Sequence, residues 1–131
     1  MRRTFLLLFV VTISASAFAQ SDNLAASIAR GKIVYEGNCT ACHQVNGEGL
    51  EGTFPPLANT GRLTDKARLV NNIYNGASGE ITVNGKKYDM EMFPVPINDK
   101  EIADVLNYVR NSWGNKNPEF ITEAEVKGLK H

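Results

Sequence analysis

Apolar residues recur along the chain at two spacings, one typical of helices and one of strands. Residues three and four apart share one face of a helix, so this spacing predicts amphipathic helices. Alternation on both sides of Asn84-Gly85 predicts a hairpin over residues 81–88, because Asn-Gly suits a two-residue type I′ turn. The predicted helices are residues 21–38, a segment capped by Thr64 and stopped by Gly76, a segment from Asn98 to Trp113-Gly114, and a short one at Thr122 and Glu125. The pattern therefore predicts an all-α protein with one small hairpin.

The predicted first helix contains an internal glycine, Gly31. Gly31 lies four residues before Tyr35, and Cys39 follows four residues later, so all three share one face. Glycine inside a helix costs about 1 kcal/mol relative to alanine. Either Gly31 breaks the helix, or it permits close approach by another helix. We expect the partner to be the helix after Asn98, whose apolar face consists of Ile102, Val105, Leu106 and Val109. We expect Asp22 or Asn23 to cap the first helix. Its apolar positions are Leu24, Ile28, Val34 and Tyr35.

The pattern of residues at the N-terminus predicts an export signal. Arg2 and Arg3 precede an apolar run over residues 5–13, and Ala17-Phe18-Ala19 matches an A-x-A cleavage site. We expect residues 1–19 to be a signal peptide and residues 20–131 to be one domain in the periplasm, with a polar C-terminal tail over residues 115–131. The alternative is an uncleaved anchor, but a spanning helix needs about 20 apolar residues and this run is shorter.

Charge and hydropathy exclude two classes of partner. The 14 basic and 14 acidic side chains become 12 and 14 once Arg2 and Arg3 are removed, a net side-chain charge of −2. No run rich in lysine or arginine exists, so nothing indicates nucleic-acid binding. No long apolar stretch follows the signal, so we expect no membrane span after its cleavage.

The stretch Cys39-Thr40-Ala41-Cys42-His43 carries the chemistry. C-x-x-C-H is the attachment signature of a c-type haem. The two thiols can form thioethers on one edge of the porphyrin, and the histidine then becomes the proximal iron ligand. Both cysteines of the chain lie in this motif. We therefore expect one covalently bound haem c held by Cys39, Cys42 and His43.

Three other readings of the motif are weaker. A redox dithiol would be typical of a βαβ context, which this chain lacks. A zinc site needs four ligands, and outside the motif only His131 remains as a cysteine or histidine donor. An inert buried cysteine pair would leave the adjacent histidine without a reason.

A low-spin c-type haem needs a second axial ligand, usually a thioether or an imidazole. The mature chain offers Met90, Met92 and His131. His131 is the last residue of the tail and reaches the iron only if the tail folds back. Met90 and Met92 point to the same side of an extended backbone, so either can serve. We favour Met92, because Phe93-Pro94 after it forms a rigid apolar segment suited to a dry pocket.

The loop over residues 44–60 is rich in glycine and proline and reads as an irregular wrap around a cofactor edge. A metal-bound histidine almost always donates its other ring N–H to a carbonyl or carboxylate. The turn Pro55-Pro56-Leu57 is rigid enough to hold such a carbonyl. We expect the Pro55 carbonyl to orient His43.

Together these residues resemble the class I bacterial cytochromes c. The matching stretches are Gly31-x-x-x-Tyr35-x-x-x-Cys39-Thr40-Ala41-Cys42-His43, Phe54-Pro55-Pro56-Leu57-Ala58, Tyr88 to Met92, and residues 102–115. The last stretch is similar to cytochrome domains found with copper nitrite reductases and with periplasmic quinoprotein or flavin dehydrogenases. The resemblance implies a helical fold around one haem, crossing terminal helices and a proline carbonyl on the proximal histidine.

The resemblance also bears on the second ligand. In the family a methionine four residues after a tyrosine binds iron, which maps to Met92 after Tyr88. The residue after that methionine is commonly proline, whereas this chain has Phe93 there and Pro94 one position later. Met90 therefore remains an alternative.

The function we expect is one-electron transfer by a protein that is not itself an enzyme. Its partners would be a redox donor and acceptor, such as a copper nitrite reductase, a terminal oxidase or a periplasmic dehydrogenase. The alternatives are a dedicated electron-transfer subunit of a reductase or dehydrogenase complex, and a haem enzyme or gas-binding protein with an open sixth site.

Overall fold

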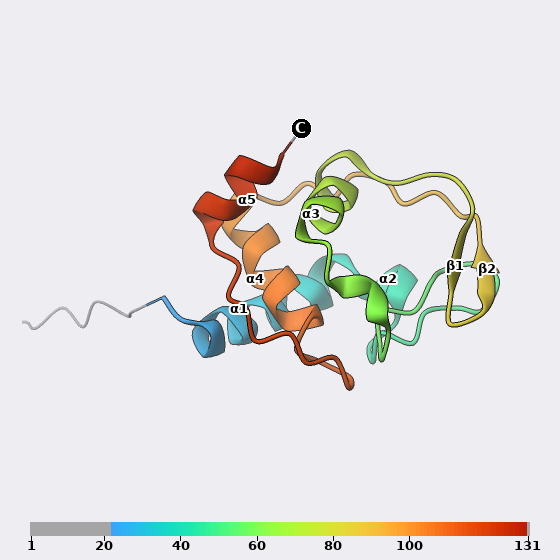
Figure 1. The fold of residues 1–131 in the computed structure, drawn as a ribbon, viewed down its shortest axis with the longest axis horizontal. Coiled ribbons are helices and arrows are strands. Elements are labelled where there is room, and N and C mark those ends of the chain that lie inside the picture. Colours follow the sequence, from blue (N-terminus) through green and yellow to red (C-terminus); the bar gives the residue numbers. More distant parts are fainter. Residues whose placement is uncertain (1–21, 131) are drawn as a thin grey trace, which may run out of the picture.

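The computed structural model describes residues 22–130, so the expected signal peptide and His131 lie outside the described residues. The fold is helical with one two-stranded antiparallel sheet, which confirms the predicted fold class (Figure 1). Within residues 22–130 no helix is long and apolar enough to cross a membrane. The elements in chain order are α1 (Leu24–Asn38), α2 (Thr40–His43), a 3-10 turn (Gly61–Leu63), α3 (Lys66–Asn75), β1 (Ile81–Val83), β2 (Lys86–Tyr88), α4 (Asp99–Val109) and α5 (Glu123–Leu129).

Helices α1 and α4 form the main packing contact of the fold. They cross at Gly31, where an added Cβ would lie 1.9 Å from the Asp104 carbonyl oxygen. Only a residue without a side chain permits this approach. The prediction that Gly31 serves close packing against the helix after Asn98 is therefore confirmed, and α1 continues unbroken through it.

The buried face of α1 is the predicted face with Gly31 and Tyr35, and the structure adds Ser27 to it. It consists of Ser27, Gly31 and Tyr35, whereas Leu24, Ile28 and Val34 are only partly buried. The reason is that the close crossing selects small residues at the contact, so the longer apolar side chains lie along its margins. The cap of α1 is Asn23, one of the two predicted residues, and it accepts a hydrogen bond from the Ala26 N–H at 3.0 Å, so the helix begins at Leu24 and not at residue 21.

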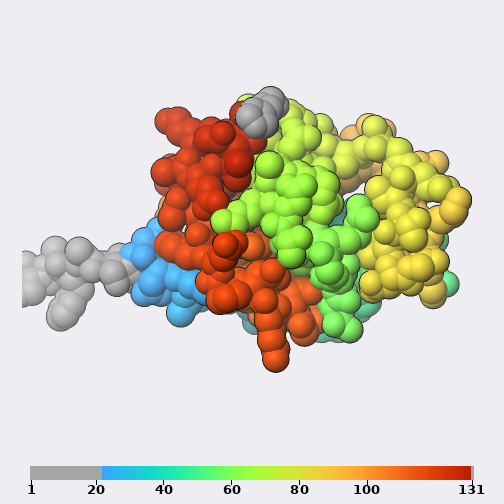
Figure 2. All heavy atoms as spheres, in the orientation of Figure 1, coloured from blue at the N-terminus to red at the C-terminus, as the bar shows by residue number. Residues whose placement is uncertain are grey.

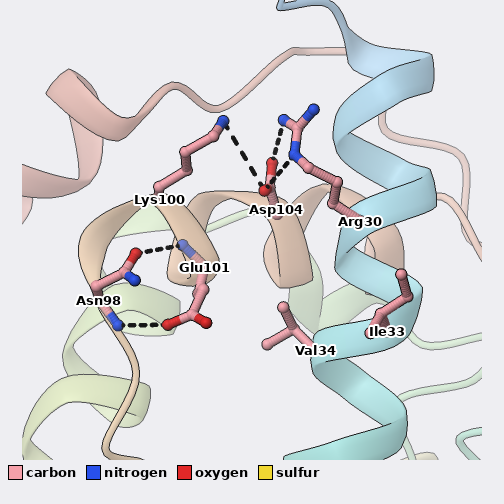
Figure 3. A pocket seen from close by; sticks show the side chains of 7 residues that line it. All are labelled: Arg30, Ile33, Val34, Asn98, Lys100, Glu101 and Asp104. Carbon is pink, nitrogen blue, oxygen red and sulfur yellow. Dashed lines mark hydrogen bonds and ion pairs between the residues drawn. The ribbon is translucent and has the colours of Figure 1, made fainter.

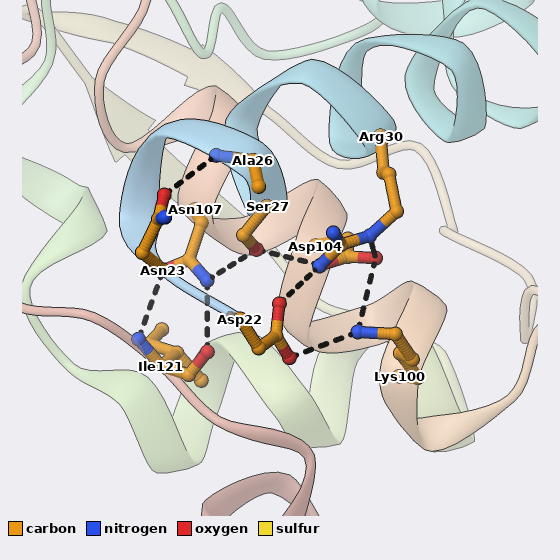
Figure 4. A network of polar contacts seen from close by, with 9 residues as sticks. All are labelled: Asp22, Asn23, Ala26, Ser27, Arg30, Lys100, Asp104, Asn107 and Ile121. Carbon is orange, nitrogen blue, oxygen red and sulfur yellow. Dashed lines mark hydrogen bonds and ion pairs between the residues drawn. The ribbon is translucent and has the colours of Figure 1, made fainter. Parts of the chain in front are cut away.

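A buried polar cluster joins α1 to α4 and to the chain before α5 (Figure 4). The Ser27 hydroxyl donates to Asp104 at 2.6 Å and accepts from Asn107 at 2.9 Å. Arg30 clamps both oxygens of Asp104 at 2.7 Å. The Asn107 amide also exchanges two hydrogen bonds with the backbone of Ile121, at 2.8 and 2.9 Å. Every polar atom buried here has a partner, so the cluster fixes the register of the two helices.

Beside this cluster lies a shallow depression between the start of α4 and the outer face of α1 (Figure 3). Asn98 caps α4 there and forms the predicted capping box, because its side chain accepts from the Glu101 N–H while Glu101 accepts from the Asn98 N–H. Ile33 borders the depression and remains 71% exposed. None of the motif residues Cys39, Cys42 and His43 lines this depression.

Two other helix boundaries differ from prediction. The cap of α3 is Asp65 and not Thr64, since the Asp65 carboxylate accepts from the Arg68 N–H at 3.0 Å. Helix α4 ends at Val109, earlier than the predicted Trp113-Gly114. Trp113 adopts a left-handed backbone conformation with φ 51°, because its ring packs against Tyr35 and Tyr108 at centroid distances of 4.9 and 5.2 Å.

The predicted hairpin is confirmed. Asn84 and Gly85 both have positive φ, 49° and 79°, as a type I′ turn requires. Figure 1 places the hairpin at the opposite end of the molecule from α5. Val83 and Tyr88, one from each strand, point inward and are buried.

The C-terminal segment is part of the core. The predicted short helix forms as α5, with Thr122 as its cap. Ile121 and Val126 are fully buried and belong to the main hydrophobic cluster. In Figure 2 α5, in red, lies directly against the yellow-green α3. The polar composition of residues 115–131 concealed these two anchors.

Candidate haem site

A cavity of about 790 Å³ lies between the helices and the hairpin. This volume falls in the range of cofactor pockets, and most of its lining is apolar. Its lining comes from the end of α1, from α2 and the loop after it, from α3, the hairpin and the chain before α4, and from α4 itself. Among its apolar lining residues are Phe54, Pro56, Leu57, Leu69, Ile73, Ile81, Val83, Val105, Leu106 and Val109.

The sequence motif contributes Cys39, Cys42 and His43 to this lining. Cys39 joins α1 to α2, so the helical turn Thr40–His43 brings both thiols and the imidazole to the cavity. Cys39 is partly buried and Cys42 exposed. Burial, with the neighbouring Cys42 thiol, raises the pKa of the Cys39 thiol to about 11. A redox dithiol requires the opposite shift, since its attacking sulfur must be a thiolate near neutral pH.

The imidazole of His43 is already oriented. Its Nδ1 lies 2.9 Å from the Pro55 carbonyl oxygen. A carbonyl only accepts, so Nδ1 carries the proton and Nε2 keeps its lone pair for another partner. Burial lowers the pKa of His43, and the Pro55 contact opposes this in part. The site therefore favours the neutral tautomer that a metal binds.

Two glycines let the loop bring Pro55 to this place. Gly49 has φ 66°, and a Cβ there would lie 2.3 Å from the Phe54 carbonyl oxygen and 2.8 Å from the Pro55 carbonyl. Gly47, also at φ 66°, lies against the Trp113 ring, with 2.6 Å from an added Cβ to the nearest ring atom. The Gly47 carbonyl accepts from Leu57 and Ala58 at 2.7 and 2.8 Å. The irregular wrap is thus a fixed structure, held by short backbone contacts.

Both methionines line the cavity, in different environments. Met92 is partly buried, and its backbone exchanges two hydrogen bonds of 2.8 Å with Ala77. Met90 is 55% exposed. The third sequence candidate, His131, lies outside the described residues.

Sequence reasoning missed two arginines of the cavity wall. Arg62 and Arg68 line the cavity. Arg62 donates to the Thr82 carbonyl at 3.2 Å, and Arg68 donates to the Arg62 carbonyl and pairs with Asp65 at 3.8 Å. Within residues 22–130 no carboxylate pairs with Arg62. Their spacing of six residues matches no helical period, but two cations directly before and within an apolar helix were a visible signal.

The matching family model is that of cytochrome c, over residues 28–113. The chain belongs to the cytochrome c family. It is 36% identical over 125 residues to a cytochrome c-552 from Thermus thermophilus, covering 87% of this chain and 83% of that protein. It is 32% identical over 103 residues to the cytochrome c subunit of a quinone alcohol dehydrogenase from Gluconobacter oxydans, covering 76% of this chain but 22% of that subunit. It is 36% identical over 99 residues to a cbb3-type cytochrome c oxidase subunit from Azospirillum brasilense, covering 70% and 30%.

This cytochrome therefore binds haem c, covalently and with its iron, and transfers electrons without itself being an enzyme. The cavity and its lining residues also fit this cofactor. The cavity is large and mostly apolar, and two cysteines, a neutral histidine and two methionines all line it. These are the donors that a c-type haem requires.

Proposed function

We propose that this cytochrome is a periplasmic one-electron carrier whose haem iron is held by His43 and Met92. Cys39 and Cys42 form the thioethers, and the Pro55 carbonyl orients the proximal imidazole. The observation that supports the proposal is that Cys39, Cys42, His43 and Met92 all line one mostly apolar cavity. The haem supplies iron that alternates between ferrous and ferric states.

The two methionines differ in how well each can serve. Met92 is partly buried and its backbone is fixed to Ala77 by two hydrogen bonds, so the main chain from which its side chain extends is held in place. Met90 is more than half exposed, and a ligand in water is easily displaced. These contacts favour Met92.

The remaining residues of the cavity control the environment of the cofactor. Burial keeps the imidazole of His43 neutral, and its hydrogen bond to the Pro55 carbonyl orients the ring and strengthens it as an iron ligand. The apolar walls exclude water. Arg62 and Arg68 suit the carboxylate side chains of a haem, since a guanidinium binds carboxylates with a planar pair of donors.

The proposed location and partners rest on the expected signal peptide, on the relatives and on the resemblance of residues 102–115 to cytochrome domains found with copper nitrite reductases. Residues 1–19 would direct export, and residues 20–131 would remain as the mature domain in the periplasm. The named relatives include subunits of a dehydrogenase and of an oxidase. A periplasmic dehydrogenase, a terminal oxidase or a copper nitrite reductase is accordingly the class of partner we propose.

The test is the optical spectrum of the haem-loaded mature protein, ferric and ferrous, with and without carbon monoxide. Met92→Ala and Met90→Ala form a matched pair of variants. We expect a low-spin haem indifferent to the gas, which only Met92→Ala makes reactive. If the unmutated protein binds carbon monoxide readily, the sixth site is open and a catalytic or gas-binding haem replaces the carrier.

A second candidate function is that of a fixed subunit within one dehydrogenase or reductase complex. The dehydrogenase and oxidase relatives favour it, because their homologous regions are parts of longer subunits. Purification from native membranes and periplasm distinguishes the two. A free carrier elutes at its monomer size, whereas a subunit elutes with its enzyme.

A further inference from the structure

Helix α5 is fastened to α3 by ionic and apolar contacts. Lys66, in the first turn of α3, places its Nζ 2.9 Å from Glu125 and 3.3 Å from Glu119. Val126 of α5 and Val70 of α3 are both fully buried in one cluster. Helix α3 contacts α5 more extensively than it contacts α4, and Figure 2 shows α3 and α5 in direct contact on this face of the molecule. The C-terminal helix is therefore a main support of α3.

A single cation connects the ends of three helices. Lys130, directly after α5, forms an ion pair with Asp99 in the first turn of α4. The same Nζ lies 4.4 Å from the centroid of the Tyr74 ring, near the end of α3. The Lys130 and Asp99 side chains are only 23% and 21% exposed, so solvent screens this pair less than a surface pair.

The end of α3 in turn holds the segment that contains Met92. The Ile73 carbonyl accepts from the Val95 N–H at 2.9 Å. Ala77, two residues after α3, exchanges two backbone hydrogen bonds of 2.8 Å with Met92. At Gly76, with φ 81°, an added Cβ would lie 2.5 Å from the Met92 carbonyl oxygen. Any displacement of the end of α3 must therefore move Met92.

We propose that α5 is a positioning element for the sixth iron ligand, and that Lys130 and Lys66 are its positioning residues. They keep α3 in place, α3 keeps the Met92 segment in place, and the strength of the Met92–iron bond depends on that support. This inference rests on the proposed His43/Met92 ligation. It gives the C-terminal segment a function that its polar sequence does not reveal.

The test measures imidazole binding to the ferric haem of the full mature protein, because imidazole must displace Met92 to bind. Lys130→Gln removes the cation with little change in length. We expect about a fivefold gain in imidazole affinity, as one partly buried ion pair and one cation–π contact are lost. Lys130→Arg should restore the original affinity, since arginine can form both contacts. Lys66→Gln should act in the same direction as Lys130→Gln.

Lys127→Gln is the matched control, because Lys127 lies on α5 and is exposed. Tyr74→Leu is a second route that keeps both charges and removes only the ring beneath Lys130; it should also raise imidazole affinity. The absorption band of the methionine–iron bond and the thermal midpoint are measured for every variant.

The two proposals fail in different ways. If Lys130→Gln and Tyr74→Leu leave imidazole affinity at the Lys127→Gln value while the methionine–iron band is intact, the positioning role is wrong, even if the thermal midpoint falls. If the unmutated protein lacks that band, the proposed ligation is wrong and the positioning role is overturned with it.

Discussion

Replacing Gly31 by alanine tests the packing on which the fold depends. A methyl group there would lie 1.9 Å from the Asp104 carbonyl oxygen and 2.8 Å from Cβ of Tyr108. Ordinary contact begins near 3.4 Å, so α1 and α4 must separate locally by about 1.5 Å. Neither neighbour can yield, because one is helix backbone and the other is the first carbon of a packed side chain.

The separation has a cost in two parts. Overpacking of a tight contact costs about 1–3 kcal/mol. The 2.6 Å hydrogen bond from Ser27 to Asp104, one turn away, would be stretched, and an unsatisfied buried polar group costs about 1–3 kcal/mol more. The better helix propensity of alanine returns about 1 kcal/mol. The expected loss for Gly31→Ala is about 3 kcal/mol in the free energy of unfolding, or about 15 °C in the midpoint for a domain of this size.

The assay is urea and thermal unfolding of the haem-loaded protein, with Gly128→Ala as the control. Gly128 lies within helix α5, away from the haem cavity, and an added Cβ there meets nothing within 4 Å. Gly128→Ala should therefore be neutral or slightly stabilising. Equal midpoints for the two variants would refute the close crossing of α1 and α4.

Three further predictions concern the loop, the polar cluster and the N-terminal charges. Gly49→Ala should displace the Pro55 carbonyl and weaken its hydrogen bond to the proximal imidazole; the imidazole then donates less to ferric iron, so the reduction potential measured by voltammetry should rise. Asn107→Ala should lower the free energy of unfolding by about 2–4 kcal/mol, because this fully buried amide satisfies several buried polar groups. Hydrogen bonds from Arg30 and, to a lesser extent, Lys100 hold the pKa of the Asp22 carboxyl below its ordinary value. The stability that these two ion pairs provide is therefore fully present above a pH of about 3.9, and it is lost as the pH falls through the lowered pKa of Asp22. Lys100→Gln should raise the pKa of Asp22 measured by NMR.

Each of these predictions has an outcome that contradicts it. Gly52→Ala is the control for Gly49→Ala, because Gly52 also has a positive φ, of 75°, but an added Cβ there meets nothing within 4 Å. If Gly52→Ala raises the reduction potential as much as Gly49→Ala does, backbone strain is the cause, and displacement of the Pro55 carbonyl is not. Asn38→Ala removes an exposed amide hydrogen bond and should change stability little; a loss equal to that of Asn107→Ala would refute the burial argument. An unchanged Asp22 pKa would mean that the ion pairs do not persist in solution.

Local sequence patterns were sufficient for the secondary structure and for the type of cofactor. Asn84-Gly85 encodes its own turn, and Asn98 with Glu101 encodes its own cap, because both depend on residues within a few positions. The haem motif is equally local, since its donors all lie within one turn of chain. Two predicted helix ends were wrong. At the start of α3 the adjacent residues Thr64 and Asp65 can both cap the helix, and Asp65 does so. At the end of α4 a contact with a distant part of the chain takes Trp113 out of the helix. Trp113 leaves the helix because Tyr35 and Gly47 hold its ring.

The roles of other residues depend on contacts between distant parts of the chain. Ser27 looks like an ordinary surface residue in the sequence, and only the crossing with α4 buries it against Asp104. Ile121 and Val126 are isolated apolar positions in a polar segment, with no period to indicate burial, yet both are fully buried. Arg110, near the end of α4, is 1% exposed and donates to the carbonyls of Leu63 and Glu119. No pattern within the helix could show this.

The sequence by itself thus determined which helices form, where the chain turns, and which residues can attach a haem. Each of these depends on propensities and spacings that act over a few residues. Tertiary structure alone decided that Ser27 of α1 is buried, which cations line the cavity, and that the C-terminal helix supports α3. These depend on the free energy of packing elements that are far apart in the chain, where shape and charge complementarity leave little trace in local sequence.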